Sequence, residues 1–159
     1  MTPIHLLLRP YCHKQHDKEV EQLRSQLWAA RVLAGNSVAL ILVVDDEYSI
    51  AEVLEAALTD AGHEVMTAMN GRQGLERLRE RRPDLVLLDL MMPIMDGTAM
   101  LKAIREDPAR CEIPVIVMSS LPEGAVAEAA RGAYTAFLRK PFKLKAVIDV
   151  ARAALSRQP

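Results

Sequence analysis

From residue 37 onward, the chain alternates short apolar runs with amphipathic stretches. The first run, from Val38 to Val44, is unbroken and ends in acidic residues, as expected of a parallel strand buried on both faces. Apolar side chains then recur at the spacing of one helical face, at Ile50, Val53, Leu54, Ala57 and Leu58. Gly62 follows where the end of a helix favours a left-handed residue. This stretch predicts a strand followed by a helix.

The same strand–helix unit recurs along the rest of the chain. Further strands are expected over 64–68, 85–88, 115–118 and 136–138. The helices between them include one capped by Asn70, with Gln73 placed to close a capping box, one through Met100 and Ile104, one over about 123–131, and a last one from Leu144 to about Leu155. The pattern predicts an α/β domain in which a five-stranded parallel sheet is sandwiched by five helices, with right-handed crossovers. In such sheets the ligand site lies beyond the carboxyl ends of the strands.

Composition excludes several functional classes. The chain of 159 residues fits one domain plus an extension, and its net charge of −1 supplies no field for nucleic acid or an anionic membrane surface. The apolar run Ile4–Leu8 is too short for a membrane span or a signal peptide. Two cysteines do not make a disulfide framework. These features favour a soluble cytoplasmic protein without nucleic-acid or membrane partners.

Polar residues with reactive side chains follow four of the predicted strands: Asp45 and Asp46, Asp89, Ser119, and Lys140. Each alone has an ordinary structural explanation as a helix cap, a turn residue or a solvated lysine. Together they place three carboxylates, a hydroxyl and an ammonium at one edge of the sheet. Carboxylates at this density need a cation, and hard oxygen ligands suit Mg²⁺. A divalent ion and Lys140 would both attract phosphoryl oxygens.

Several segments resemble the receiver domain of two-component response regulators, the family that includes the single-domain chemotaxis receivers. The segment 89–97, Asp-Leu-Met-Met-Pro-Ile-Met-Asp-Gly, is similar to the family's phosphoacceptor loop, and 139–142, Arg-Lys-Pro-Phe, is similar to its lysine loop. Segments 62–71 and 130–134 are also of the family type. The resemblance covers about residues 37–156 and implies a (βα)5 flavodoxin-like receiver fold.

The resemblance also implies a role for each residue at the strand ends. Asp89 would take a phosphoryl group from a phosphohistidine of a histidine kinase or histidine phosphotransfer protein. Asp46 and Asp89 would ligate Mg²⁺ directly, Asp45 would act through water, and the backbone carbonyl of Met91 would complete the protein ligands. Lys140 would contact a phosphoryl oxygen and precede Pro141 through a cis peptide bond. The domain would therefore be a phosphoacceptor in signalling and not a turnover enzyme, with only self-catalysed phosphoryl transfer and slow self-dephosphorylation.

Signalling would involve a local rearrangement. Ser119 would hydrogen-bond the phosphoryl group, and Phe137 would turn inward and repack the surface of the fourth and fifth helices and the fifth strand. Two departures from the family pattern stand out. Ser120 replaces a residue that is often smaller, and Phe137 lacks the hydroxyl that a tyrosine would offer.

The first 36 residues lie outside the resemblance. Residues 16–34 are expected to form a helix with Val20, Leu23 and Leu27 on one stripe, which favours either homodimerisation or packing on the chain's own domain. The receiver domain is expected over 37–159 and to stand alone. Its signal would then leave through an unknown downstream protein, or through a homodimer formed by this N-terminal helix or by the surface of the fourth helix, the fifth strand and the fifth helix. The alternative function is a receiver-shaped interaction module without phosphorylation. A haloacid-dehalogenase-like enzyme is rejected because it would need Asp-x-Asp after the first strand, and a nucleotide-binding fold because no Gly-rich loop follows that strand.

Overall fold

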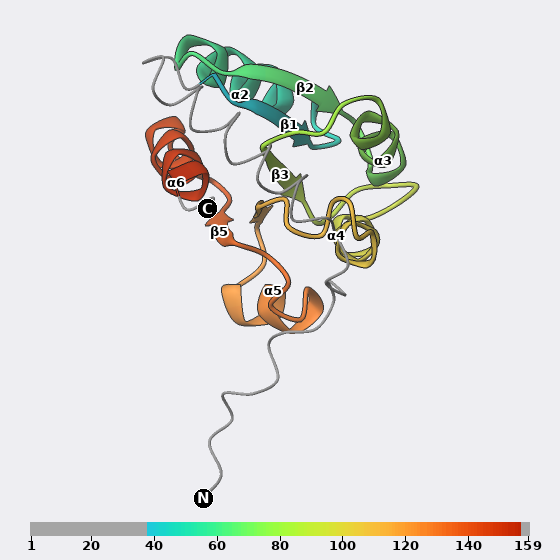
Figure 1. Cartoon of the computed structure of the whole chain (residues 1–159). Coiled ribbons are helices and arrows are strands. Elements are labelled where there is room, and N and C mark those ends of the chain that lie inside the picture. The colour runs from blue at the N-terminus through green and yellow to red at the C-terminus, as the bar shows by residue number, and fades with distance from the viewer. Residues whose placement is uncertain (1–37, 157–159) are drawn as a thin grey trace, which may run out of the picture.

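The computed structural model describes residues 38–156, which form one parallel sheet covered by helices on both faces (Figure 1). The strands are β1 (Leu40–Val44), β2 (Glu64–Ala68), β3 (Leu85–Asp89), β4 (Val115–Ser119) and β5 (Ala136–Arg139). The helices are α2 (Tyr48–Asp60), α3 (Gly71–Glu80), α4 (Gly97–Glu106), α5 (Glu123–Ala129) and α6 (Leu144–Ser156). The strand order is β2-β1-β3-β4-β5, which confirms the predicted flavodoxin-like arrangement.

The three central strands are buried along their whole length, which explains why their sequences are continuously apolar. Successive side chains of each strand point to opposite faces and so enter different cores. On β1, Leu42 and Val44 pack in the core beneath α3, α4 and α5, whereas Ile41 and Val43 pack in the core beneath α2 and α6. The edge strands β2 and β5 are only partly buried.

Side-chain caps fix where two helices begin. The side chain of Asn70 accepts a hydrogen bond of 3.0 Å from the backbone N–H of Gln73, and Asp96 accepts one of 2.8 Å from Ala99 at the start of α4. The side chain of Gln73 turns back and accepts from the N–H of Met69. The predicted cap of α3 is therefore confirmed, with the return bond one residue earlier than in a standard capping box.

Replacing Asn70 by alanine should lower the free energy of unfolding by about 1 kcal/mol, since a buried cap is lost and the N–H of Gln73 loses its partner. The measurement is urea-induced unfolding followed by circular dichroism. Gln73→Ala is the matched control, because it keeps the Asn70 cap and removes only an exposed hydrogen bond. A loss for Gln73→Ala as large as that for Asn70→Ala would contradict the assignment of the cap.

Two details differ from the sequence-based predictions. Strand β1 begins at Leu40 and not at Val38, which is exposed. Val53 was expected on the buried face of α2, but it is 48% exposed, and the buried residues of this helix are Ala51, Leu54 and Leu58.

Gly62 has a φ of 90° just after α2, as the sequence predicted for the end of this helix. The helix expected over residues 16–34, and with it the proposed dimer seam, lies outside the described residues. Within residues 38–156, no helix is both long and apolar enough to cross a bilayer.

Candidate functional site

The predicted site residues meet where the direction of strand order reverses. β1 pairs with β2 on one side and β3 on the other, so the carboxyl ends of β1 and β3 form the switch point at which open α/β sheets bind ligands. Asp45 and Asp46 directly follow β1, and Asp89 is the last residue of β3. The topology thus brings together acids that are more than forty positions apart in the sequence.

The three carboxylates form one compact cluster. Asp45, Asp46 and Asp89 each offer an oxygen, and these oxygens all lie within 4.8 Å of one another. Asp45 is completely buried and Asp89 is 5% exposed, whereas Asp46 is partly exposed at the rim. One oxygen of Asp45 accepts a hydrogen bond of 2.9 Å from the backbone N–H of Glu47, which fixes its orientation. The other oxygen faces Lys140.

Lys140 brings the balancing positive charge from the end of β5. Its ammonium lies 2.7 Å from Asp45 Oδ2 and 3.5 Å from Asp89 Oδ1. The backbone N–H of Lys140 donates to the carbonyl of Ser119, which anchors the loop to β4, and the peptide bond between Lys140 and Pro141 is cis, the isomer that the resemblance implies. The ammonium therefore reaches Asp45, at the end of β1, although β3 and β4 lie between β1 and β5 in the sheet.

Burial and the neighbouring charges together shift the pKa values of Asp89 and Lys140. Burial raises the pKa of Asp89, and the neighbouring carboxylate of Asp45 raises it further, although the charge of Lys140 works against both. For Lys140, burial lowers the pKa, but the hydrogen bond to Asp45 and the charge of Asp89 outweigh it, so that the pKa is raised. The cluster as a whole carries more negative than positive charge, which favours a cation beside Lys140.

The donor set of the cluster fits a hard divalent cation. Three carboxylates converge on one point, they are oxygen ligands, and Asp46 and Asp89 both line an open pocket that leaves room for water. Mg²⁺ is held in proteins by a small number of carboxylates together with waters and phosphoryl oxygens. A site of this composition can bind such an ion and a phosphoryl group together.

Ser119 lies at the end of β4 with 1% of its surface exposed, and its hydroxyl oxygen accepts a hydrogen bond of 3.1 Å from the N–H of Leu121. Phe137 lies on β5 opposite Val117 and is partly buried against the core beneath α3, α4 and α5. The two predicted switch residues therefore lie on neighbouring strands, with Ser119 at the crevice and Phe137 two residues before the strand's end.

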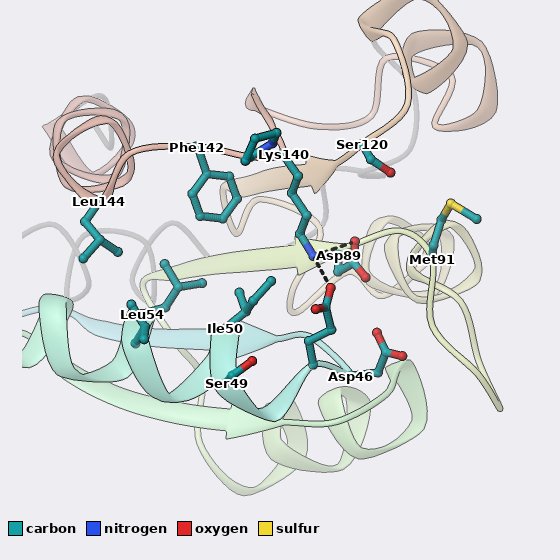
Figure 2. Close-up of a pocket in the computed structure, with 13 residues that line it drawn as sticks. Asp46, Ser49, Ile50, Leu54, Asp89, Met91, Ser120, Lys140, Phe142 and Leu144 are labelled. Atoms are coloured by element: carbon teal, nitrogen blue, oxygen red, sulfur yellow. Dashed lines mark ion pairs between the residues drawn. The ribbon is translucent and has the colours of Figure 1, made fainter.

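A pocket of about 730 Å³ opens beside the acids (Figure 2). One end carries Asp46, Asp89, Met91 and Lys140, and the other is apolar, with Ile50, Leu54, Phe142 and Leu144 directed into it. These apolar residues, and Glu47 at the rim, were not singled out from the sequence as site residues. Glu47 could have been noticed as the third acid in a row at the end of β1. Val53 also lines the pocket, which accounts for its exposure.

The loop after Asp89 is tightly constrained. The N–H of Gly97 donates to the carbonyl of Leu90 at 3.0 Å, so the chain folds back on itself within a few residues. At the tip, Ile94 has a φ of 71° and is 73% exposed, and the N–H of Met95 donates to the carbonyl of Pro93 across it. Such a turn is strained for a β-branched residue and persists because the rest of the loop is held.

Comparisons with known proteins find similarity over most of the described residues. The family model for the response regulator receiver domain matches residues 41–152. The chain is 38% identical over 125 residues to "Probable transcriptional regulator ycf27" of Porphyra purpurea, covering 77% of this chain and 49% of that protein. It is 36% identical over 118 residues to the DNA-binding response regulator MtrA of Mycolicibacterium paratuberculosis, covering 74% of this chain and 51% of MtrA. The chain thus spans about half the length of the curated relatives it matches.

Among solved structures, the chemotaxis protein CheY4 of Vibrio cholerae is similar, with a TM-score of 0.70 and 29% sequence identity. The match covers 74% of this chain and 98% of the CheY4 chain. The CheY4 chain therefore consists almost entirely of the fold described above.

Proposed function

Because the chain belongs to the response regulator receiver domain family of two-component signalling, we propose that Asp89 is the residue that accepts the phosphoryl group. Among the acids of the cluster, Asp89 is the one at the end of β3 that is both little exposed and part of the pocket wall. Asp45 is buried completely beneath Lys140, and Asp46 lies at the rim. Asp89 therefore combines shielding from water with access for a donor.

In this reaction the phosphoryl group moves from the imidazole nitrogen of a phosphohistidine to a carboxylate oxygen of Asp89. A carboxylate oxygen of Asp89 attacks the phosphorus of a phosphohistidine, the bond from phosphorus to the imidazole nitrogen breaks, and the imidazole leaves with the bond's electron pair. Lys140 is placed to stabilise the charge on the transferred group, since its ammonium already lies 3.5 Å from the oxygen of Asp89. The domain acts as a signalling acceptor, and its own catalysis is limited to taking up and slowly losing the phosphoryl group.

Asp45, Asp46, Asp89 and the backbone carbonyl of Met91 are the groups that would hold Mg²⁺. When bound, the ion neutralises the acids and offsets the charge of the phosphoryl oxygens. The protein's own part is to keep the carboxylates convergent, which it does through the N–H of Glu47 on Asp45 and the fixed ends of β1 and β3.

The signal would leave through a repacked surface. Phosphorylation adds roughly two negative charges beside Ser119, and its hydroxyl would move toward them. Phe137 would then move inward, and the surface of α5, β5 and α6 would change. The upstream partner is a histidine kinase or a histidine phosphotransfer protein. The downstream partner is a protein that binds this surface. The proposed bounds of the receiver domain are residues 37–159.

The observation that carries the proposal is the convergence of three carboxylates and Lys140 at the β1–β3 switch point. Incubation with acetyl phosphate and Mg²⁺ should yield a single phosphoryl adduct in the intact mass spectrum, and omission of Mg²⁺ should abolish it. Calorimetric titration with Mg²⁺ provides the control for metal binding. A protein that binds Mg²⁺ and gains no adduct would be a receiver-shaped interaction module instead.

A further inference from the structure

The exposed carboxylate of Glu47 shares the ammonium of Lys140 with the acceptor. Glu47 Oε1 lies 3.8 Å from Lys140 Nζ, and Asp89 Oδ1 lies 3.5 Å from the same nitrogen. Figure 2 shows Lys140 directed toward Asp89. We propose that Glu47 shortens the lifetime of the phosphorylated state by competing for Lys140 and by repelling the phosphoryl group. The inference rests on the proposed function, because it concerns the discharge of a phosphoryl group held on Asp89.

The backbone holds Glu47 firmly at the mouth of the pocket. Its N–H donates to Asp45, and its carbonyl accepts the N–H groups of Ile50 and Ala51, each at 3.0 Å, at the start of α2. The side chain is 61% exposed and lines the pocket together with Asp46 and Asp89. The negative charge of Glu47 is thus tied to the site, while the carboxylate itself stays free to move toward or away from Lys140.

The charges around Lys140 show why this matters after phosphorylation. In the structure the ammonium faces three carboxylates, those of Asp45, Asp89 and Glu47. Among the described residues, Lys140 is the ion-pair partner of Glu47. A phosphoryl group on Asp89 brings roughly two further negative charges and needs the same ammonium. Glu47 then pulls Lys140 away from the phosphoryl oxygens and faces those oxygens with a like charge.

Hydrolysis relieves this repulsion. The oxygen of a water molecule attacks phosphorus, the bond from phosphorus to the oxygen of Asp89 breaks, and Asp89 is regenerated as a carboxylate while the proton passes through inorganic phosphate to solvent. The transition state of phosphoryl transfer is loose, so the bond that holds the phosphoryl group on Asp89, within reach of Glu47, is already largely broken there. A nearby carboxylate therefore destabilises the phosphorylated ground state more than the transition state, and discharge is faster.

The test is the rate of phosphoryl loss in Glu47→Gln. Each protein is loaded with acetyl phosphate at saturating Mg²⁺, the donor is removed by rapid desalting, and intact mass follows the decay. One charge acting across a partly solvated gap of this size should lengthen the lifetime by roughly three- to tenfold. Glu55→Gln is the matched control, since it removes the same charge from an exposed position of α2 that does not line the pocket. The Mg²⁺ affinity of each variant is measured separately by calorimetry, so that saturation is assured.

Glu47→Asp separates charge from shape, because it keeps the carboxylate and shortens the side chain. A lifetime close to that of the wild type in Glu47→Asp and Glu55→Gln, together with a longer one in Glu47→Gln, supports the inference. Equal lifetimes in Glu47→Gln and Glu55→Gln would overturn it while leaving phosphorylation of Asp89 intact. Equal lengthening in Glu47→Gln and Glu47→Asp would also overturn it, since charge would not be the cause. A wild-type protein that takes up no phosphoryl group would overturn the proposed function itself.

Discussion

Asp89→Asn should remove phosphorylation completely. The amide cannot act as the anionic nucleophile, and the remaining acids cannot replace it: Asp45 is fully buried and bonded to Lys140, and Asp46 lies at the rim. In the intact-mass assay with acetyl phosphate and Mg²⁺, the adduct expected for the wild type should be absent from this variant. This is the largest functional effect that the structure predicts for one substitution.

The loss should not come from unfolding. Burial raises the pKa of Asp89 in the folded state, so the folded protein binds its proton more tightly than the unfolded chain does. Stability therefore falls as the pH rises from the unfolded pKa through the folded pKa, and ionised Asp89 destabilises the metal-free fold at neutral pH. Asp89→Asn removes that cost, and its midpoint of thermal unfolding without metal should equal or exceed that of the wild type. An adduct of undiminished size in Asp89→Asn would show that another residue is the acceptor.

Gly97→Ala should produce the largest loss of stability. A Cβ at this position would lie 2.1 Å from the carbonyl oxygen of Asp89 and 2.8 Å from the Cα of Leu90. Both are backbone atoms, at the last residue of β3 and the residue after it, and the N–H of Gly97 is bonded to the carbonyl of Leu90. Neither side can therefore move without disrupting the loop between Asp89 and Gly97. We expect a loss of at least about 3 kcal/mol in the free energy of unfolding, the upper end for overpacked sites. Chemical denaturation measures it.

Gly124→Ala should instead raise the free energy of unfolding. Gly124 lies in α5 with nothing within 4 Å of an added Cβ, so alanine should stabilise the domain by up to about 1 kcal/mol through helix propensity. If the two variants changed stability by similar amounts, the close approach of Gly97 to the end of β3 would be wrong.

Much of the fold follows from the sequence because the central strands are buried on both faces. The runs that became β1, β3 and β4 are continuously apolar, and each ends in a polar residue that marks the carboxyl edge of the sheet. The cap at Asn70 and the left-handed conformation of Gly62 could also be predicted from the sequence, because each depends on residues close in sequence. The meeting of Asp45, Asp89 and Lys140 depends on the order of the strands, which the resemblance to the receiver family implied and the structure shows.

Other features depend on packing that no local pattern encodes. Val53 fits the apolar spacing of α2, yet it faces the pocket, because helical spacing does not say where the edge of the buried stripe lies. The contact of Glu47 with Lys140 requires the loop after β5 to lie over the start of α2, which only the tertiary structure reveals. Ile94 is another case, since a β-branched residue at positive φ contradicts its own propensity and is held there by the surrounding loop.

The most direct test of the central claim is to locate the phosphoryl group in the wild-type protein. Borohydride reduces an aspartyl phosphate to homoserine, and peptide mass mapping then identifies the modified position. The account predicts homoserine at position 89 alone, only after treatment with phosphodonor and Mg²⁺. Homoserine at position 45 or 46, or a phosphoryl adduct without homoserine at position 89, would contradict it.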